Sequence, residues 1–400
     1  MKNMVISDKI TPLQLEHAAR CIYDARSIAI ITHQNPDGDA MGSSLAMRYL
    51  LLALGKTEVT NIVPTSFPDF LGWLPGVESA IQYEQQPEAA ERALRDADLV
   101  ICTDLGEPTR VAALSPVLAE RFEAYFSEKP SSPSQPRMPS QPSDLLIIDH
   151  HLSPVCTAHP EQIAYPDSAS ASELVFRLAW QLQKDSRTIV LTNNGQSRDN
   201  TESNRPYFLT SEFATCIYTG MMTDTGNFSY NSCQPEMYSI VAMLLTTGIN
   251  KDAIYDRVFN AYSADRMRLI GYCLYHKMQV INEYHTAIIT LNRREMYRFN
   301  AKSGDMEGIV NLPLQIKDVY YSILMREDKV PPHQQAEAGG SKIKAKISFR
   351  SQGNRPVNIL AREVFRGGGH MNASGGEYFG TVDDAAKKLI EQMPKYLQKD

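Results

Sequence analysis

Three short apolar runs, each followed directly by acidic or histidine side chains, constrain the fold of this chain more than any other feature. The runs cover residues 27–32, 98–103 and 144–148 (SIAIIT, DLVICT and DLLII). Short runs rich in Val, Ile and Leu are typical of strands buried on both faces of a parallel sheet. Because ligands bind beyond the carboxyl ends of such strands, we expect an α/β fold with its functional side chains at one sheet edge.

Side chains suited to metal coordination follow each run. They are His33, Asp37 and Asp39 after the first run, Asp104 after the second, and Asp149, His150 and His151 after the third. A further candidate, Asp224, ends a helical stretch over residues 212–222. Nitrogen and oxygen ligands without thiolates favour Mn²⁺, Mg²⁺ or Fe²⁺ over a structural zinc site. Two aspartates one residue apart, Asp37 and Asp39, fit two neighbouring ions better than one, which indicates a two-metal hydrolase.

The residues around these motifs carry weaker signals. Gly38 is expected to give the turn after the first strand its freedom, and a helix over residues 39–54 is expected to end at Gly55. Met221, Met222 and Tyr230 lie near Asp224 in the sequence, and we expect them to pack in the core rather than to line a cleft. The tripeptide Asp224-Thr225-Gly226 also occurs in aspartic proteases, but a single copy in an α/β pattern excludes that class.

Length and composition indicate a cytoplasmic protein of two domains. The chain has 400 residues, which is longer than a domain with a single hydrophobic core usually is. Hydrophobic residues make up 43% of it, as is typical of a globular protein. No apolar stretch approaches the roughly 18 residues of a membrane span, and the N-terminus lacks the apolar core of a signal peptide. Six cysteines without CxxC spacing fit reduced thiols. A net charge of −6 argues against binding long duplex nucleic acid.

The pattern of helices and strands changes along the chain. Residues 1–250 alternate strands with helices, which predicts a larger catalytic domain with a parallel sheet flanked by helices. Residues 251–284 are expected to form a helical linker, and residues 285–400 a smaller C-terminal α/β domain, with the active-site cleft between the two domains. The Pro- and Ser-rich segment 127–143 is expected to be a surface insertion, to which we assign no role.

A glycine-rich turn marks the second domain. Its residues are Gly367, Gly368, Gly369 and His370. Successive glycines expose backbone N–H groups and let a ligand approach closely. Three lysines over residues 342–346 alternate with apolar residues, so a solvated strand face accounts for them equally well. Arg350 and Arg355 are better candidates for binding a phosphate.

Together, these motifs resemble the four motifs of the DHH-family phosphoesterases, nearly from end to end of the chain. The resemblance implies two Mn²⁺ ions per site, with Mg²⁺ or another divalent ion as the alternative. It implies a first ion held by His33, Asp37 and Asp104, and a second held by Asp39, Asp104, His150 and Asp224. Asp104 would bridge the ions, His151 would act on the phosphate, and Asp149 would orient an imidazole.

The C-terminal part resembles the DHH-associated domain, and the whole chain is most similar to the NrnA-type subgroup. The segment 347–351 (ISFRS) and the GGGH turn carry this likeness. It implies a hydrolase that cleaves short oligoribonucleotides to mononucleotides and 3′-phosphoadenosine 5′-phosphate (pAp) to AMP. Arg350, the three glycines and His370 would bind the nucleotide end distant from the scissile phosphate.

Several alternatives stay open at this point. A phosphodiesterase for cyclic dinucleotides or their linear products is the nearest, and a non-catalytic nucleotide-binding protein is more remote. A RecJ-like exonuclease would need a further domain, and a family-II pyrophosphatase would lack GGGH. The sequence leaves cleavage polarity, preference for RNA or DNA and the native metal undecided, and a homodimer is expected without any motif that specifies it.

Overall fold

The structure is a computed structural model that describes residues 6–127, 144–151, 155, 158–184, 207–302, 304–331 and 334–397. The chain forms two compact units, Met1–Ala261 and Tyr262–Asp400. Apart from Ser127, the predicted insertion 127–143 lies outside the described residues.

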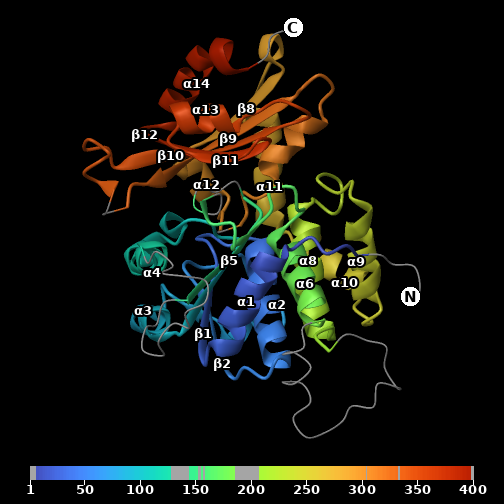
Figure 1. Cartoon of the computed structure of the whole chain (residues 1–400). Coiled ribbons are helices and arrows are strands. Elements are labelled where there is room, and N and C mark those ends of the chain that lie inside the picture. The colour runs from blue at the N-terminus through green and yellow to red at the C-terminus, as the bar shows by residue number, and fades with distance from the viewer. Residues whose placement is uncertain are drawn as a thin grey trace, which may run out of the picture. The chain divides into compact units, whose positions relative to one another are not determined.

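A six-stranded parallel sheet forms the centre of the first unit (Figure 1), in the order β3-β2-β1-β4-β5-β6. The strands are β1 (Ser27–Ile31), β2 (Glu58–Val63), β3 (Ile81–Gln82), β4 (Leu99–Thr103), β5 (Asp144–Asp149) and β6 (Ile163–Ala164). The strand order reverses between β1 and β4, which pair directly, with Ile31 opposite Cys102. In open α/β sheets the crevice at such a switch point receives the ligand. The predicted fold class is therefore confirmed, and the first two motifs follow the two strands at the switch point.

Helices cover both faces of this sheet (Figure 1). One face carries α1 (Pro12–Asp24), α2 (Gly38–Ala53), α6 (Ala171–Leu182), α8 (Ser211–Asp224), α9 (Pro235–Leu245) and α10 (Lys251–Phe259). The other face carries α3 (Pro87–Asp96) and α4 (Ser115–Ser127). Within β1, Ile28 and Ile30 pack into the first core, whereas Ala29 and Ile31 pack into the second. Burial on both faces explains why the strand runs are apolar at every position.

The second unit contains a mixed six-stranded sheet in the order β11-β12-β10-β9-β8-β7. Its strands are β7 (Met278–Ile281), β8 (Thr286–Leu291), β9 (Tyr321–Lys329), β10 (Ile343–Ser351), β11 (Gly368–His370) and β12 (Ala373–Phe379). Strands β8 and β9 pair in parallel, and the other pairs among the described strands of this sheet are antiparallel. Helices α13 (Asn358–Val364) and α14 (Val382–Tyr396) pack on one face. Helices α11 (Ala264–Tyr272) and α12 (Arg293–Arg298) and the 3₁₀ helix η7 (Ile309–Gln315) pack on the other.

Two details of the second half differ from the predictions. Residues 251–284 do not form one helical linker, because α10 buries Ile254 and Val258 in the first unit while α11 buries Leu269 in the second. Within that range, Met278–Ile281 is strand β7 and Asn282–Tyr284 is a 3₁₀ helix. The GGGH segment is a strand rather than a turn, since Gly368–His370 pairs with β12.

Within the residues that the structure describes, no helix combines the length and the apolar character needed to cross a membrane.

Candidate metal centre

The predicted metal-binding residues of the first unit meet beyond the carboxyl ends of β1, β4 and β5. His33 lies two residues after β1, Asp104 directly follows β4, and Asp149 ends β5. The Asp104 amide donates a hydrogen bond of 2.9 Å to the carbonyl of Ile148, which keeps it beside β5. Parallel pairing therefore brings together side chains that are far apart in the sequence.

Asp104 lies at the centre of this group and is 2% exposed. Its Oδ2 is 3.1 Å from His33 Nε2, and its Oδ1 is 3.5 Å from His150 Nε2 and 3.2 Å from His151 Nδ1. Burial alone would raise the pKa of Asp104, but the positive charge of His151 and the neighbouring imidazoles of His150 and His33 hold this pKa well below its usual value. Asp104 also has a left-handed backbone (φ 55°), which aspartate and asparagine adopt more readily than most residues.

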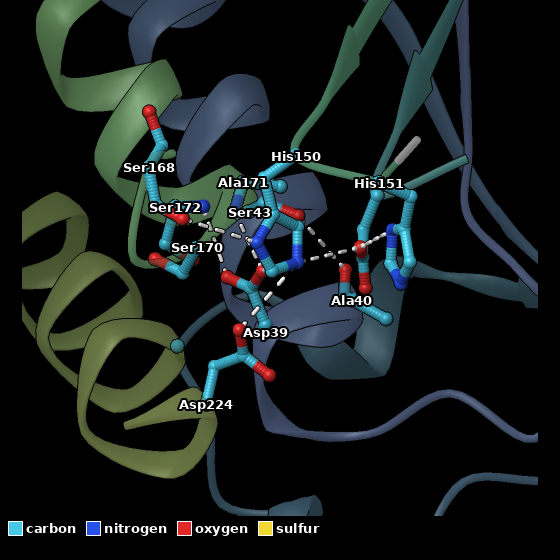
Figure 2. A network of polar contacts seen from close by, with 12 residues as sticks. Asp39, Ala40, Ser43, His150, His151, Ser168, Ser170, Ala171, Ser172 and Asp224 are labelled. Atoms are coloured by element: carbon cyan, nitrogen blue, oxygen red, sulfur yellow. Dashed lines mark hydrogen bonds and ion pairs between the residues drawn. The ribbon is translucent and has the colours of Figure 1, made fainter. Parts of the chain in front are cut away.

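His150 faces carboxylates from two different helices (Figure 2). Its Nε2 is 3.8 Å from Asp39 Oδ2 on α2 and 3.4 Å from Asp224 Oδ2 at the end of α8. On the other side of the ring, Nδ1 donates to the carbonyl of Ser168 at 3.4 Å. A proton fixed on Nδ1 turns the other ring nitrogen toward the carboxylates, which is the usual arrangement of a metal-binding histidine.

Asp39 is held by the N-terminus of α6, a contact that we did not predict from the sequence. Its Oδ2 accepts a hydrogen bond from the Ala171 amide at 2.7 Å, and its Oδ1 accepts one from the Ser172 amide at 2.9 Å (Figure 2). Ser170 caps α6 by accepting from the amide of Glu173. The Ser-x-x-Glu spacing is a recognisable signal for a helix start, but no sequence pattern indicates that this start binds Asp39.

Close packing of α2 against α8 brings Asp224 to the site. A Cβ atom at Gly42 would lie 2.6 Å from the carbonyl oxygen of Cys216, and one at Gly220 would lie 2.8 Å from Asp39 Oδ1. A Cβ atom at Gly38 would lie 2.3 Å from Thr223 Oγ1. Gly38 is the first residue of α2, so its role is close helix contact and not the turn freedom that we expected.

Two groups of potential ligand atoms share one carboxylate. His33, Asp37 and Asp104 each offer a ligand atom within 4.8 Å of the others, and so do Asp39, Asp104 and His150. Asp37 also caps α2, because its Oδ1 accepts from the amides of Asp39 and Ala40, both at 3.0 Å. The geometry therefore places Asp37 and Asp39 in different groups, with Asp104 common to both.

His151 and Asp149 form a pair beside these groups. Asp149 Oδ1 accepts hydrogen bonds from the backbone amide of His151 at 3.2 Å and from its Nδ1 at 2.8 Å. Although burial alone would lower the pKa of His151, the Asp104 and Asp149 carboxylates raise it to about 9. Asp104, Asp149 and His151 also lie close enough to one another to form a third group of potential ligands.

Two independent observations indicate that this set of donor atoms fits divalent cations. Asp104 Oδ1 and Asp149 Oδ2 are buried and make no hydrogen bond within the described part of the chain, which is costly for a carboxylate oxygen. Burial, together with the charges of Asp104 and Asp224, raises the pKa of Asp39 well above its usual value. Burial also raises the pKa of Asp224 to about 6, although 29% of its side chain is exposed. Hard oxygen donors and imidazole nitrogens around excess negative charge suit Mn²⁺ or Mg²⁺.

These pKa shifts predict how the stability of the metal-free protein depends on pH. The charged form of His151 stabilises the fold fully below about pH 6.5, and this stabilisation is lost as the pH rises toward its folded pKa of about 9. The raised pKa of His150 acts in the same direction. We expect the unfolding free energy in EDTA to fall by about 3 kcal/mol across this range. Thermal unfolding followed by circular dichroism at several pH values measures it.

Added Mn²⁺ should reverse the trend, because metal ligands must release their protons before they bind. The gain in melting temperature on adding Mn²⁺ should therefore grow between pH 6.5 and 8.5. A melting temperature in EDTA that rises with pH would contradict the protonated state of this site.

In the second unit, Arg350 and His370 lie on one face of the sheet. Arg350 on β10 and His370 on β11 both pair with Ala373 of the intervening strand β12. Residues directly opposite in antiparallel strands point to the same face. A Cβ atom at Gly367 would lie 1.9 Å from the carbonyl oxygen of Gly375, so this glycine permits the close approach of the two strands.

The basic residues around Arg350 have protein partners. Lys344 Nζ is 2.6 Å from Glu377 Oε2, and Lys346 Nζ is 3.0 Å from Asp328 Oδ2. The Arg355 guanidinium stacks on the ring of Tyr320 at 4.0 Å. Lys344 is buried, so the expectation of a solvated strand face is wrong for it.

Comparison with known proteins extends these findings. Residues 27–221 match the DHH family, N-terminal domain, a range that ends three residues before Asp224. The chain is 26% identical over 371 residues to a protein of Thermus thermophilus named bifunctional oligoribonuclease and PAP phosphatase NrnA, and covers 90% of it. It is 37% identical to an exopolyphosphatase-related protein of Bacteroides fragilis whose crystal structure superposes with a TM-score of 0.75, with 98% of each chain covered.

A more distant structure shares the fold. RecJ from Thermus thermophilus, solved in complex with Mn²⁺, is 13% identical with a TM-score of 0.50, and the match covers all of this chain and 57% of RecJ. The match of the first unit, the likeness to relatives over nearly the whole chain and the four motifs agree: this chain is a member of the DHH family.

Proposed function

We propose that this protein is a metal-dependent phosphoesterase that hydrolyses short oligoribonucleotides to mononucleotides and pAp to AMP. The observation that carries the proposal is the position of Asp104 in both groups of ligand atoms. A carboxylate shared by two neighbouring cation sites is typical of enzymes that displace a leaving group at phosphorus with two metal ions. The relative from Thermus thermophilus, named for both activities, supports this choice of substrates.

We assign His33, Asp37 and Asp104 to one Mn²⁺ ion and Asp39, Asp104, His150 and Asp224 to the other. The distance of 3.4 Å between Asp224 Oδ2 and His150 Nε2 supports including Asp224 in the second set. When bound, such ions lower the pKa of water and stabilise negative charge on phosphate oxygens. The RecJ structure, which contains Mn²⁺, supports the choice of ion only at the level of the shared fold.

His151 is the proposed proton donor and phosphate-contacting residue. Its Nδ1 proton is held by Asp149 Oδ1 at 2.8 Å, which fixes the orientation of the ring. With a pKa of about 9 before metal binds, the ring carries a positive charge at neutral pH that complements a phosphate. Asp149 acts through His151 and is therefore a positioning residue.

The second unit is proposed to bind the part of the substrate that is not cleaved. Arg350 and His370 share one sheet face, and Gly368 and Gly369 leave the backbone of β11 uncovered by side chains. Arginine, imidazole and backbone N–H groups are suitable partners for a phosphate or a ribose. A homodimer and a cytoplasmic location stay predictions.

A product assay tests the proposed function. Purified protein with Mn²⁺ is offered pAp, a 5′-phosphorylated RNA dinucleotide, a long RNA, cyclic di-AMP, pyrophosphate and polyphosphate, each with an EDTA control. We expect turnover of the dinucleotide and of pAp that EDTA abolishes, and little turnover of the long RNA. Chromatography of the products measures both rate and identity.

Other outcomes of this assay would redirect the proposal. A preference for cyclic di-AMP would indicate turnover of cyclic dinucleotides. A preference for polyphosphate would agree with the name of the relative from Bacteroides fragilis. Nucleotide binding without turnover of any substrate would contradict an enzymatic role.

A further inference from the structure

The loop that follows Asp224 makes an unusual left-handed turn. Gly226, Asn227 and Phe228 have consecutive positive φ angles of 52°, 56° and 62°. Left-handed backbone is costly for residues other than glycine, so a run of three needs support from its surroundings. Thr225 supplies this support, because its Oγ1 accepts the amide of Phe228 at 3.0 Å and its carbonyl accepts the amide of Tyr230 at 3.2 Å. The chain thus returns to the residue next to Asp224.

Aromatic packing fixes the far side of this turn. The ring of Phe228 lies 5.8 Å from that of the buried Tyr218, measured between ring centroids. Strained backbone that the surrounding structure holds in place is concentrated at functional sites. The strain here follows directly after a candidate metal ligand, so a side chain that the turn presents is a candidate for contact with the substrate.

The turn presents Tyr230. Half of this side chain is exposed (50%), so the expectation that it packs in the core is wrong, whereas Met221 and Met222 are fully buried as expected. The ring lies against the backbone of Gly226, since a Cβ atom there would be 2.2 Å from Tyr230 Cε1. Glycine at this position therefore allows both the left-handed turn and the position of the ring.

The ring is within reach of a nucleotide whose phosphate lies at the metal centre. Two Cα–Cα steps separate Asp224 from Gly226, so their Cα atoms are at most about 7.6 Å apart. The ring edge that touches Gly226 is accordingly within about 11 Å of the Asp224 Cα atom. This separation corresponds to the extent of one nucleotide from phosphate to base.

The chemistry of the loop favours a base over a second phosphate. Close to Tyr230 in the sequence, Asn227, Ser229 and Asn231 are exposed, and these three side chains carry no charge. An aromatic ring among neutral hydrogen-bonding groups is a suitable surface for a nucleobase, and such stacking tolerates every base. We propose that Tyr230 is a stacking platform for one nucleobase of the substrate, a subsite that rests on the proposed phosphoesterase function.

Removal of the Tyr230 ring should raise KM only for substrates that carry the stacked base. Wild-type protein and Tyr230→Ala are compared on an RNA dinucleotide and on its two singly abasic analogues, with kcat and KM measured separately. We expect Tyr230→Ala to raise KM for the parent dinucleotide by about tenfold, within the range that base stacking supplies. For one of the two abasic analogues the variant and the wild type should have the same KM.

Matched variants separate stacking from a general loosening of the loop. Tyr230→Phe retains the ring and should behave as wild type. Tyr238→Ala removes an equally exposed tyrosine (48%) that packs on the same loop through Phe228, and should leave KM unchanged. Calorimetric titration with Mn²⁺ should give the same affinity for wild type and Tyr230→Ala.

The outcomes distinguish this inference from the proposed function. Wild-type protein that hydrolyses none of the three substrates contradicts both. Wild-type turnover with an equal effect of Tyr230→Ala on all three substrates, or with the same effect from Tyr238→Ala, overturns the stacking platform alone. Loss of Mn²⁺ affinity in Tyr230→Ala would assign the residue to the support of Asp224 and likewise overturn it.

Discussion

Asp104→Asn should lower kcat by at least about 1000-fold at saturating Mn²⁺. The substitution removes the only carboxylate common to both groups of ligand atoms, so it weakens two cation sites at once. A loss of several kcal/mol of transition-state stabilisation corresponds to this factor. Asparagine is preferable to alanine because position 104 is left-handed (φ 55°), where asparagine is tolerated. Steady-state kinetics and calorimetric counting of bound Mn²⁺ measure the result.

Asp144→Asn is the matched control for this variant. Asp144 is the first residue of β5, the strand that ends at Asp149. Its Oδ2 forms an ion pair with Arg20 Nη1 at 3.6 Å. Its replacement should leave both kcat and the number of bound ions unchanged. Circular dichroism shows whether the Asp104→Asn variant folds. A folded variant that retains more than a tenth of the wild-type activity would contradict a shared bridging carboxylate.

His151→Ala should lower kcat by about 10²–10⁴-fold and still bind two ions, because the imidazole acts on the phosphate and is not assigned to either cation. Asp149→Asn should have a smaller effect, about 10–100-fold, since it only weakens the hydrogen bond of 2.8 Å that orients the ring. Kinetics at saturating metal, combined with Mn²⁺ titration, separate loss of catalysis from loss of binding.

A partly buried histidine outside the groups of potential ligands serves as control for this pair of variants. His159 pairs with Glu161 at 3.4 Å, and His159→Ala should have wild-type kinetics. If His151→Ala instead binds fewer ions than wild type, His151 is a metal ligand, in agreement with its place in the third group of potential ligands. That result would contradict its assignment as the proton donor.

Local sequence patterns predicted the three strands and the helices that carry the candidate ligands of the first unit. The helix expected over residues 39–54 is α2 (Gly38–Ala53), and Gly55 has the left-handed backbone (φ 83°) typical of a helix end. The three apolar runs are β1, β4 and β5 with boundaries within one residue. Such patterns succeed because strand burial and helix capping depend on residues close together in the sequence.

The segments predicted incorrectly depend on contacts with other elements of the fold. Gly38 needs to be glycine because Thr223 lies against it, and Gly367 because Gly375 does. The GGGH segment is a strand only because β12 is available to pair with it. Intrinsic preferences of glycine favour a turn there, and pairing with the adjacent strand overrides them.

The sequence by itself determined the identity of the candidate ligands, because the carboxyl ends of buried parallel strands are where α/β folds bind ligands, and carboxylates and imidazoles gather there. Only the tertiary structure decided how these ligands are held. The start of α6 binds Asp39 through the amides of Ala171 and Ser172. Those contacts join residues more than 130 positions apart through backbone atoms, which every residue type except proline supplies alike, so no residue pattern encodes them.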